Sequence, residues 1–154
     1  MISLYEKKDE NLHMVHKESV HFPPHLHSGL EMVYVTRGSL VLGIGCEMYQ
    51  MEKGDFAIVF PNLIHHFQVF GEGRKEAFYI VPQMSLTGCF MEELQKKYPT
   101  NPVIKKENVH PDIYKSILQL YKEEVRNPII EQAHIQIILT RSMSQFELVS
   151  RESL

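Results

Sequence analysis

The chain has 154 residues, of which 44% are hydrophobic and 23% charged, the ordinary composition of one globular domain. Its 16 basic and 19 acidic residues give a net charge of −3, and no basic cluster exceeds a pair, which excludes a nucleic-acid-binding surface in this segment. No apolar run reaches the length of a membrane span, and no secretory leader is visible.

Two cysteines, Cys46 and Cys89, stand far apart in the sequence. Without a secretory signal, this usage is typical of a reducing, cytoplasmic setting in which disulfides do not form. Free cysteines are among the residues most often buried, so we expect both thiols to lie in the core.

Turn-forming residues punctuate the first half of the chain at short intervals. Between them lie runs of strand length rich in Val, Ile, Tyr and Phe, which cover 31–36, 39–44, 48–51, 56–60, 65–70 and 76–82. So many short strands predict a sandwich or barrel that closes its own edges. We expect the barrel, with an N-terminal arm, to occupy residues 1–84.

The pattern changes after Pro82, and residues 85–154 are expected to be a helical segment of the same structural unit. A short helix is predicted near 87–98. Apolar residues then recur at helical spacing over 111–126, with Pro111 suited to the first turn. Asn127 and Pro128 end this helix and start a second one over 128–149, so an antiparallel hairpin is predicted.

The second predicted helix is apolar around more than one stripe. Its apolar residues are Ile129, Ile130, Ile135, Ile137, Ile138 and Leu139. One face can pack on the barrel, and the remainder predicts a homodimer interface. The alternative is that the barrel buries all of them.

The most informative motif is H-x-H-x3-E-x6-G, formed by His25, His27, Glu31 and Gly38, followed by Gly54 and His65 in G-x10-H. A straight strand from His25 to Glu31 would span about 20 Å, too far for one ion. The chain must therefore fold back between them, and Ser28-Gly29 supplies a residue that tolerates a positive φ.

Strand alternation places Glu31, Val33 and Val35 on one face and Met32, Tyr34 and Thr36 on the other. A buried carboxylate without a partner would cost several kcal/mol, so Glu31 is expected to face a metal, a histidine or a polar ligand. The predicted ligand-binding residues are His25, His27, Glu31, Val33, Val35 and His65. No catalytic residue is predicted.

Two interpretations of this cluster remain open. Imidazoles and a carboxylate suit a divalent metal such as Zn, Ni, Mn or Fe, with His25, His27, Glu31 and His65 as ligands and one position left open. Alternatively, the same residues form a metal-free polar cluster that holds a small molecule. The remaining histidines are predicted to face solvent or to cap helices, although His16 and His21 lie on a segment that could cover the barrel mouth; the set comprises His13, His16, His21, His66, His110 and His134.

Residues 22–67 resemble the cupin core, and specifically the sensor domain of AraC-type transcriptional regulators. The first cupin motif is matched at His25, His27, Glu31 and Gly38, and the second at Gly54 and His65. The sequence departs from many cupins at Phe60, Asn62 and Val69. Such departures are typical of the regulator branch, in which a Gly-Asp turn precedes Pro-Asn and a histidine.

The resemblance implies a mainly β fold, a cupin (double-stranded β-helix or jelly-roll) barrel followed by a C-terminal helical hairpin. It further implies that the barrel binds a small-molecule effector, such as a sugar or other metabolite, and that the hairpin pairs two subunits. DNA would be bound only through a helix-turn-helix domain that this chain does not contain, and no membrane contact is expected. The alternatives are a stand-alone metal-dependent cupin enzyme, of the dioxygenase or isomerase class, and a structural dimerisation module with an occluded barrel.

Overall fold

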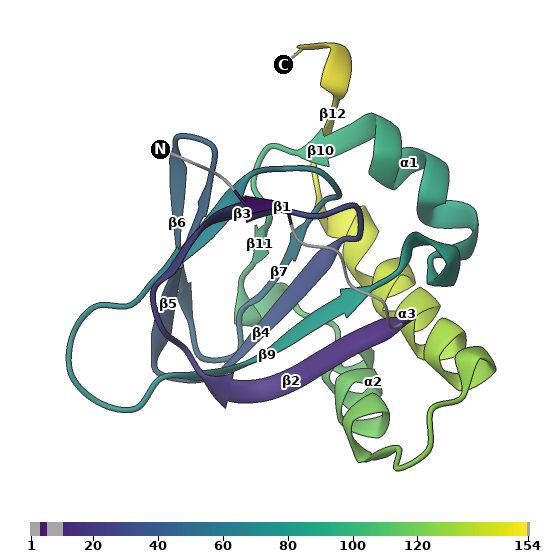
Figure 1. Cartoon of the computed structure of the whole chain (residues 1–154), viewed down its shortest axis with the longest axis horizontal. Helices are drawn as coiled ribbons and strands as arrows, with labels where there is room; N and C mark the ends of the chain where they lie inside the picture. Colours follow the sequence, from purple (N-terminus) through teal and green to yellow (C-terminus); the bar gives the residue numbers. More distant parts are fainter. Residues whose placement is uncertain (1–3, 6–10, 154) are drawn as a thin grey trace.

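The computed structural model describes residues 4–5 and 11–153, which form two facing sheets and a layer of helices (Figure 1). The first sheet has the order β1 (Leu4–Tyr5), β3 (Phe22–Leu26), β8 (His65–Gln68), β5 (Ser39–Ile44) and β6 (Glu47–Glu52). The second has the order β11 (Val103–Ile104), β7 (Phe56–Val59), β4 (Glu31–Arg37), β9 (Glu76–Pro82) and β2 (Leu12–Glu18). The predicted cupin-type jelly roll with a C-terminal helix pair is confirmed, but the two sheets face each other without closing into a barrel, because in the described part of the chain their edge strands are not paired with each other.

The central strand β4 has the two faces that its alternation predicts. Val33 and Val35 belong to the buried cluster between the sheets, whereas Met32 packs in a second cluster shared with the helices. Tyr34 also faces the helices, and its ring stacks on Tyr114 with centroids 4.6 Å apart. The sheet that contains β4 is therefore covered on both faces, which explains why its strands β7 and β9 are almost continuously apolar.

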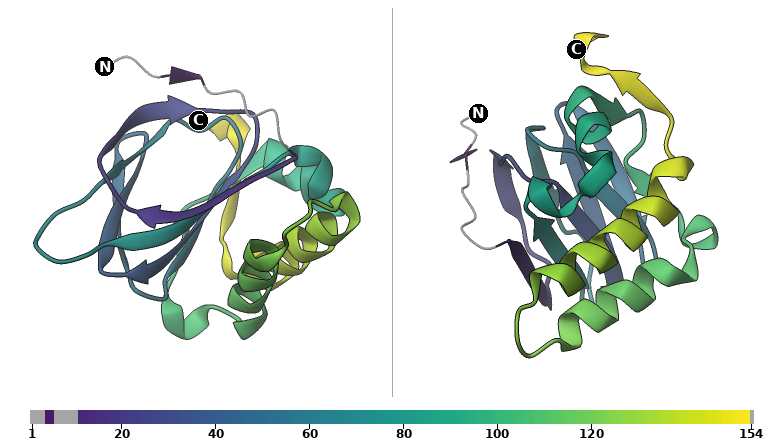
Figure 2. Two further views of the ribbon diagram at one scale, coloured as in Figure 1. Left: turned by 60° about the horizontal axis from the view of Figure 1, so that its bottom comes forward. Right: turned by 90° about the vertical axis from the view of Figure 1, so that its right-hand side faces the viewer.

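Helix α2 (Pro111–Lys122) and helix α3 (Pro128–Ser142) form an antiparallel hairpin that lies across the outer face of this sheet (Figure 2). The first turn of each helix is capped by a side chain. His110 accepts a hydrogen bond from Asp112 N, and Asn127 accepts hydrogen bonds from Ile129 N and Ile130 N. Ile117 and Ile138 are fully buried in the cluster that joins the hairpin to the sheet.

The helices are shorter than predicted. Helix α1 covers only Met91–Lys96 and follows two 3-10 turns, η1 (Met84–Leu86) and η2 (Gly88–Phe90). A further turn, η3 (Lys106–Asn108), precedes α2, which ends four residues early. After α3 the chain passes through η4 (Met143–Gln145), pairs β12 (Leu148–Ser150) with β10 (Lys97–Pro99), and ends in η5 (Arg151–Ser153).

The early end of α3 has a packing reason. Phe146 turns towards Phe60, with ring centroids 6.0 Å apart, and Leu148 packs against the same core cluster. A continued helix would have replaced the β10–β12 ladder and these apolar contacts. The tertiary contacts therefore outweigh the helical pattern over 143–149.

The prediction that both cysteines are buried is wrong, since Cys46 and Cys89 are exposed and unpaired. Cys46 lies in the tight turn between β5 and β6, directly after Gly45, whose φ of +58° marks the reversal. Cys89 lies in the short turn η2, outside the packed face. Among the described helices, none is long and apolar enough to cross a membrane.

Candidate ligand and metal site

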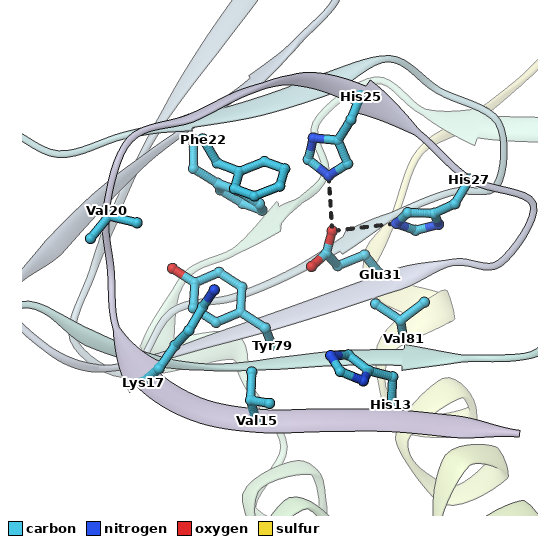
Figure 3. A pocket seen from close by; sticks show the side chains of 11 residues that line it. His13, Val15, Lys17, Val20, Phe22, His25, His27, Glu31, Tyr79 and Val81 are labelled. Atoms are coloured by element: carbon cyan, nitrogen blue, oxygen red, sulfur yellow. Dashed lines mark ion pairs between the residues drawn. The ribbon is translucent and has the colours of Figure 1, made fainter. Parts of the chain in front are cut away.

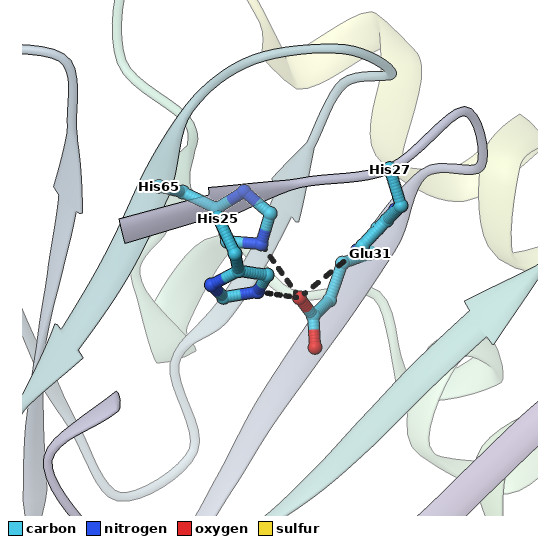
Figure 4. A group of neighbouring side chains, drawn as sticks. All are labelled: His25, His27, Glu31 and His65. Atoms are coloured by element: carbon cyan, nitrogen blue, oxygen red, sulfur yellow. Dashed lines mark hydrogen bonds and ion pairs between the residues drawn. The ribbon is translucent and has the colours of Figure 1, made fainter. Parts of the chain in front are cut away.

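Three strands bring the motif residues together at one end of the space between the sheets. His25 on β3 is paired in register with His65 on β8, and His27 and Glu31 flank the turn that leads into β4. All four side chains are buried, and one potential ligand atom from each lies within 4.8 Å of the others (Figure 4).

The turn between His27 and Glu31 folds back as required, but Gly29 does not supply the predicted positive φ. Glycine is needed at position 29 for a steric reason, because a Cβ there would lie 2.8 Å from the carbonyl oxygen of Pro82. Such a contact is too short for any side chain without movement of the backbone. The glycine therefore allows the turn to pack directly against the end of β9.

Among the described residues other than glycine, Asn62 has a positive φ, of +61°. Many cupins have glycine at this position, and asparagine is one of the few other residues that adopt this conformation at moderate cost. Its amide donates to the carbonyl oxygen of His27 at 3.0 Å, which ties the second motif to the first. The departure from the cupin pattern thus preserves the local backbone.

We expect Asn62→Ala to lower the free energy of unfolding by about 1 kcal/mol, because alanine is strained in the left-handed region. Asn62→Gly should retain most of the stability at the same position. Urea denaturation of both variants measures the difference. Equal stability of the alanine and glycine variants would show that the positive φ at position 62 does not limit which residue is tolerated there.

The three histidines have one orientation in common. Each Nδ1 lies close to a backbone carbonyl two residues away, at 2.9 Å for His25 and Pro23 O, 2.8 Å for His27 and Gly29 O, and 2.9 Å for His65 and Leu63 O. A carbonyl oxygen only accepts, so each Nδ1 carries a hydrogen. The Nε2 atoms of all three rings then face Glu31.

The distances from these Nε2 atoms to Glu31 Oε1 are 2.8 Å for His65, 3.6 Å for His27 and 3.9 Å for His25. Both partners at the shortest contact bear lone pairs when the imidazole is neutral. The His65–Glu31 pair therefore requires a proton on Nε2, or a cation in its place.

Two opposing effects act on the pKa of the Glu31 carboxyl. Burial by itself would raise the pKa of its carboxyl, but the nearby imidazoles of His25 and His27, the hydrogen bond from His65 and the charge on His65 hold that pKa well below its usual range. Glu31 is consequently ionised at neutral pH, as a metal ligand must be.

The residues fit a divalent cation by donor type and by arrangement. Ligand atoms about 2.1 Å from one ion lie roughly 3–4 Å apart, which is the range of the Nε2–Oε1 distances above. The carbonyl partners of the Nδ1 atoms supply the outer contacts that normally fix the tautomer and orientation of metal-binding histidines.

A cavity of about 190 Å³ opens beside this cluster, between β2, β3, β4 and β9 (Figure 3). Its polar lining consists of His13, Lys17, His25, His27 and Glu31. Its apolar lining consists of Val15, Val20, Phe22, Phe67, Tyr79 and Val81. A small, mostly apolar cavity with a few convergent polar groups is the usual form of a ligand site.

The sequence model described as the AraC-like ligand binding domain matches residues 9–140. This chain belongs to the AraC-like ligand-binding domain family. No curated protein sequence matches it significantly.

Solved structures of ToxT from Vibrio cholerae have a similar fold. The apo K231A structure from strain SCE256 is 6% identical with a TM-score of 0.60, covering 91% of this chain and 58% of ToxT. ToxT of strain O395, bound to (E)-4-(8-methylnaphthalen-1-yl)but-3-enoic acid, is 9% identical with a TM-score of 0.56, covering 89% and 58%. The AraC-like domain thus spans little more than half of the ToxT chain.

The cavity of this AraC-like domain differs from the predicted site in its apolar part. Val33 and Val35 lie on the predicted inner face, but they are packed in the core and do not line the cavity. The wall is formed instead by residues of β2, chiefly His13, Val15 and Lys17. Their period-2 spacing was the signal that could have placed them, although polar side chains obscured it.

The other histidines of the AraC-like domain have separate roles. His16 points away from the cavity, and its Nε2 forms a hydrogen bond of 2.8 Å with Thr36 Oγ1. His16 therefore does not cover the mouth of the cavity. His66 is half-buried, with its ring over Gly43, and His134 contacts Ser116 Oγ at 3.0 Å. His110 caps α2 as predicted, and His21 lies beside Phe70 at the surface.

Tyr79 in the cavity wall also has a shifted pKa. Burial raises the pKa of its phenol to about 12, the hydrogen bond with Ser19 (2.7 Å) lowers it, and the charge of Glu31 raises it further. Because the folded pKa lies above the unfolded value of about 10, its contribution to stability is complete below pH 10. That contribution is lost as the pH rises towards 12.

A titration of phenolate absorbance should therefore show one tyrosine ionising near pH 12 in the folded protein. Tyr79→Phe should remove this late component and leave the other tyrosines unchanged. A late component that persists in Tyr79→Phe would contradict the assignment.

Proposed function

We propose that this AraC-like domain senses a small molecule, which binds in the cavity and alters the position of the helical hairpin. The observation that carries the proposal is the double role of strand β2. Its residues 13, 15 and 17 line the cavity, whereas Met14 and His16 between them face the helices.

His16 makes the connection between the two layers. Its ring lies 4.4 Å from that of Phe78 on β9 and 6.2 Å from that of Tyr121 on α2, measured between centroids. Tyr121 also contacts Phe78, with centroids 5.2 Å apart. A ligand that displaces β2 must change this aromatic contact, and so favours one hairpin position over another.

A thermal-shift screen of the full chain against sugars and other metabolites tests this function. A ligand at 100 times its dissociation constant stabilises the fold by about 2.7 kcal/mol. Val15→Trp, which fills the cavity, should abolish that stabilisation, whereas the exposed Val125→Trp should not. The proposal fails if no compound stabilises the chain, or if Val15→Trp responds like the wild type.

We further propose that His25, His27, Glu31 and His65 hold a divalent cation, for which Zn, Ni, Mn and Fe are all suitable by donor type. When bound, such an ion supplies a Lewis-acidic position for an effector oxygen. The contacts of the three Nδ1 atoms with backbone carbonyl oxygens fix the orientation of the imidazole rings. The carboxylate of Glu31 compensates part of the charge of the ion.

A sensor is preferred over the alternative of a stand-alone metal-dependent enzyme. The family match extends through β2, the cavity and most of the helical hairpin, and β2 joins the cavity to that hairpin. In this proposal DNA is contacted only through a separate domain. Substrate turnover that depends on an added metal and is lost in His27→Ala would instead favour the enzyme.

The hairpin is proposed to pair two subunits. Ile135 and Ile138 are buried against the sheet, but Ile129 is 79% exposed and Ile137 is 39% exposed, so the alternative that the barrel buries every apolar residue of α3 is wrong. Exposed apolar side chains on a helical surface favour association with a second copy.

Ile129→Asp should raise the dissociation constant of the dimer at least about tenfold, because it places a charge in the proposed interface. Gln95→Asp, an exposed polar position on α1 outside the hairpin, is the control and should leave it unchanged. Sedimentation equilibrium measures both constants. A wild-type chain that remains monomeric at all concentrations would contradict the pairing.

A further inference from the structure

The cavity contains one cation that has no acidic partner among the described residues. Lys17 projects from β2 with its Nζ 5.2 Å from the ring centroid of Tyr79, and no described carboxylate forms an ion pair with it. Figure 3 shows Lys17 and Tyr79 on one wall, with His25, His27 and Glu31 at the opposite end. The aromatic face stabilises the ammonium group but does not neutralise it.

The opposite end of the cavity already has its own negative charge. Glu31 is the one acidic residue among those that line the cavity, and its carboxylate is held by three histidines. Glu31 is thus compensated within its own cluster, which leaves Lys17 as the charged side chain of the lining without an opposite charge beside it.

The space between the two ends is apolar and small. Phe22, Phe67 and Val81 are among its walls, and 190 Å³ corresponds to about six water molecules. A ligand that fills it must have a compact apolar body. Its charged group must be negative, since the unpaired cation of the wall is Lys17.

We propose that the effector of this cavity is a small organic carboxylate with a compact apolar body, and that Lys17 pairs with its carboxylate group. This assignment rests on the proposed sensing function and names the chemical class of ligand at the same site. Lys17 is exposed at the rim, so its ammonium group is accessible to an entering anion. In the metal-free protein the inner histidines face Glu31, so Lys17 is the cation left for that group.

Benzoate, benzamide and benzylamine test the charge preference, because they share one shape and differ in charge. Calorimetry on the full chain should show that benzoate binds at least about tenfold more tightly than benzamide, and that benzylamine binds weakest. Lys17→Met should remove the preference for benzoate, whereas Lys17→Arg should retain most of it. Lys53→Met, in the exposed turn after β6, is the matched control and should bind like the wild type.

The inference is overturned if benzamide binds as tightly as benzoate, if benzoate does not bind, or if Lys17→Met binds benzoate like the wild type. The sensing function is judged separately by the metabolite screen. A neutral compound that stabilises the chain and loses its effect in Val15→Trp would uphold the sensor and reject the anionic ligand.

Discussion

His65→Ala is expected to weaken binding of Co²⁺ at least about 100-fold, because it removes one of the four converging ligands. The Nε2 atom of His65 lies 2.8 Å from Glu31 Oε1. Cobalt is a useful probe, since its visible spectrum reports the number and type of its ligands. The titration begins with protein that has been treated with a chelator and dialysed. The spectrum of the wild type should indicate mixed nitrogen and oxygen coordination.

The adjacent residue provides a matched control for this experiment. His66 lies on the same strand but faces Gly43 on the other side of the sheet, so His66→Ala should leave the cobalt affinity unchanged. Equal losses in both variants would show that the ion does not bind at the cluster. Absence of cobalt binding by the wild type would refute the cation site without affecting the proposed effector cavity.

Glu31→Gln should lower the free energy of unfolding at pH 7 by about 3 kcal/mol in metal-free protein, because the buried histidines lose their compensating charge. The folded pKa of Glu31 is lowered below the ordinary value of 4.5, so the stabilisation is present above that pH. It is lost as the pH falls through the folded pKa. The wild type and the variant should therefore converge in stability under acidic conditions.

Urea denaturation between pH 7 and pH 3, in the presence of a chelator, measures this convergence. Glu92→Gln is the control, since Glu92 forms an exposed pair with Lys96 and its removal should change the stability little. A constant difference between wild type and Glu31→Gln across the whole pH range would mean that the carboxylate does not stabilise the fold through its charge.

The strands and the polar cluster could be predicted because their signals are local. Glycine and proline separate the strand runs, and the spacing of His25, His27 and Glu31 requires a single reversal of the chain. Asn62 shows the same principle, since a residue that tolerates positive φ stands where the backbone needs it.

The remaining features depend on contacts between distant segments. Gly29 is required by the carbonyl of Pro82, more than fifty residues away, which no local pattern reveals. The end of α3 is decided by Phe146 and its contact with Phe60. Lys17 is a polar residue on the edge strand β2, and its position over the ring of Tyr79 follows only from the pairing of β2 with β9.

The alternation of β2 separates two kinds of substitution. In the proposed sensor, a change at position 13, 15 or 17 is expected to alter which molecule the cavity accepts, while the side chains at 14 and 16 keep their contact with the helical layer. A change at 14 or 16 alters how the hairpin is held and leaves the cavity lining intact. The proposed sensing function would then have effector specificity and coupling to the hairpin in adjacent residues of one strand, so that each could diverge in evolution without the other.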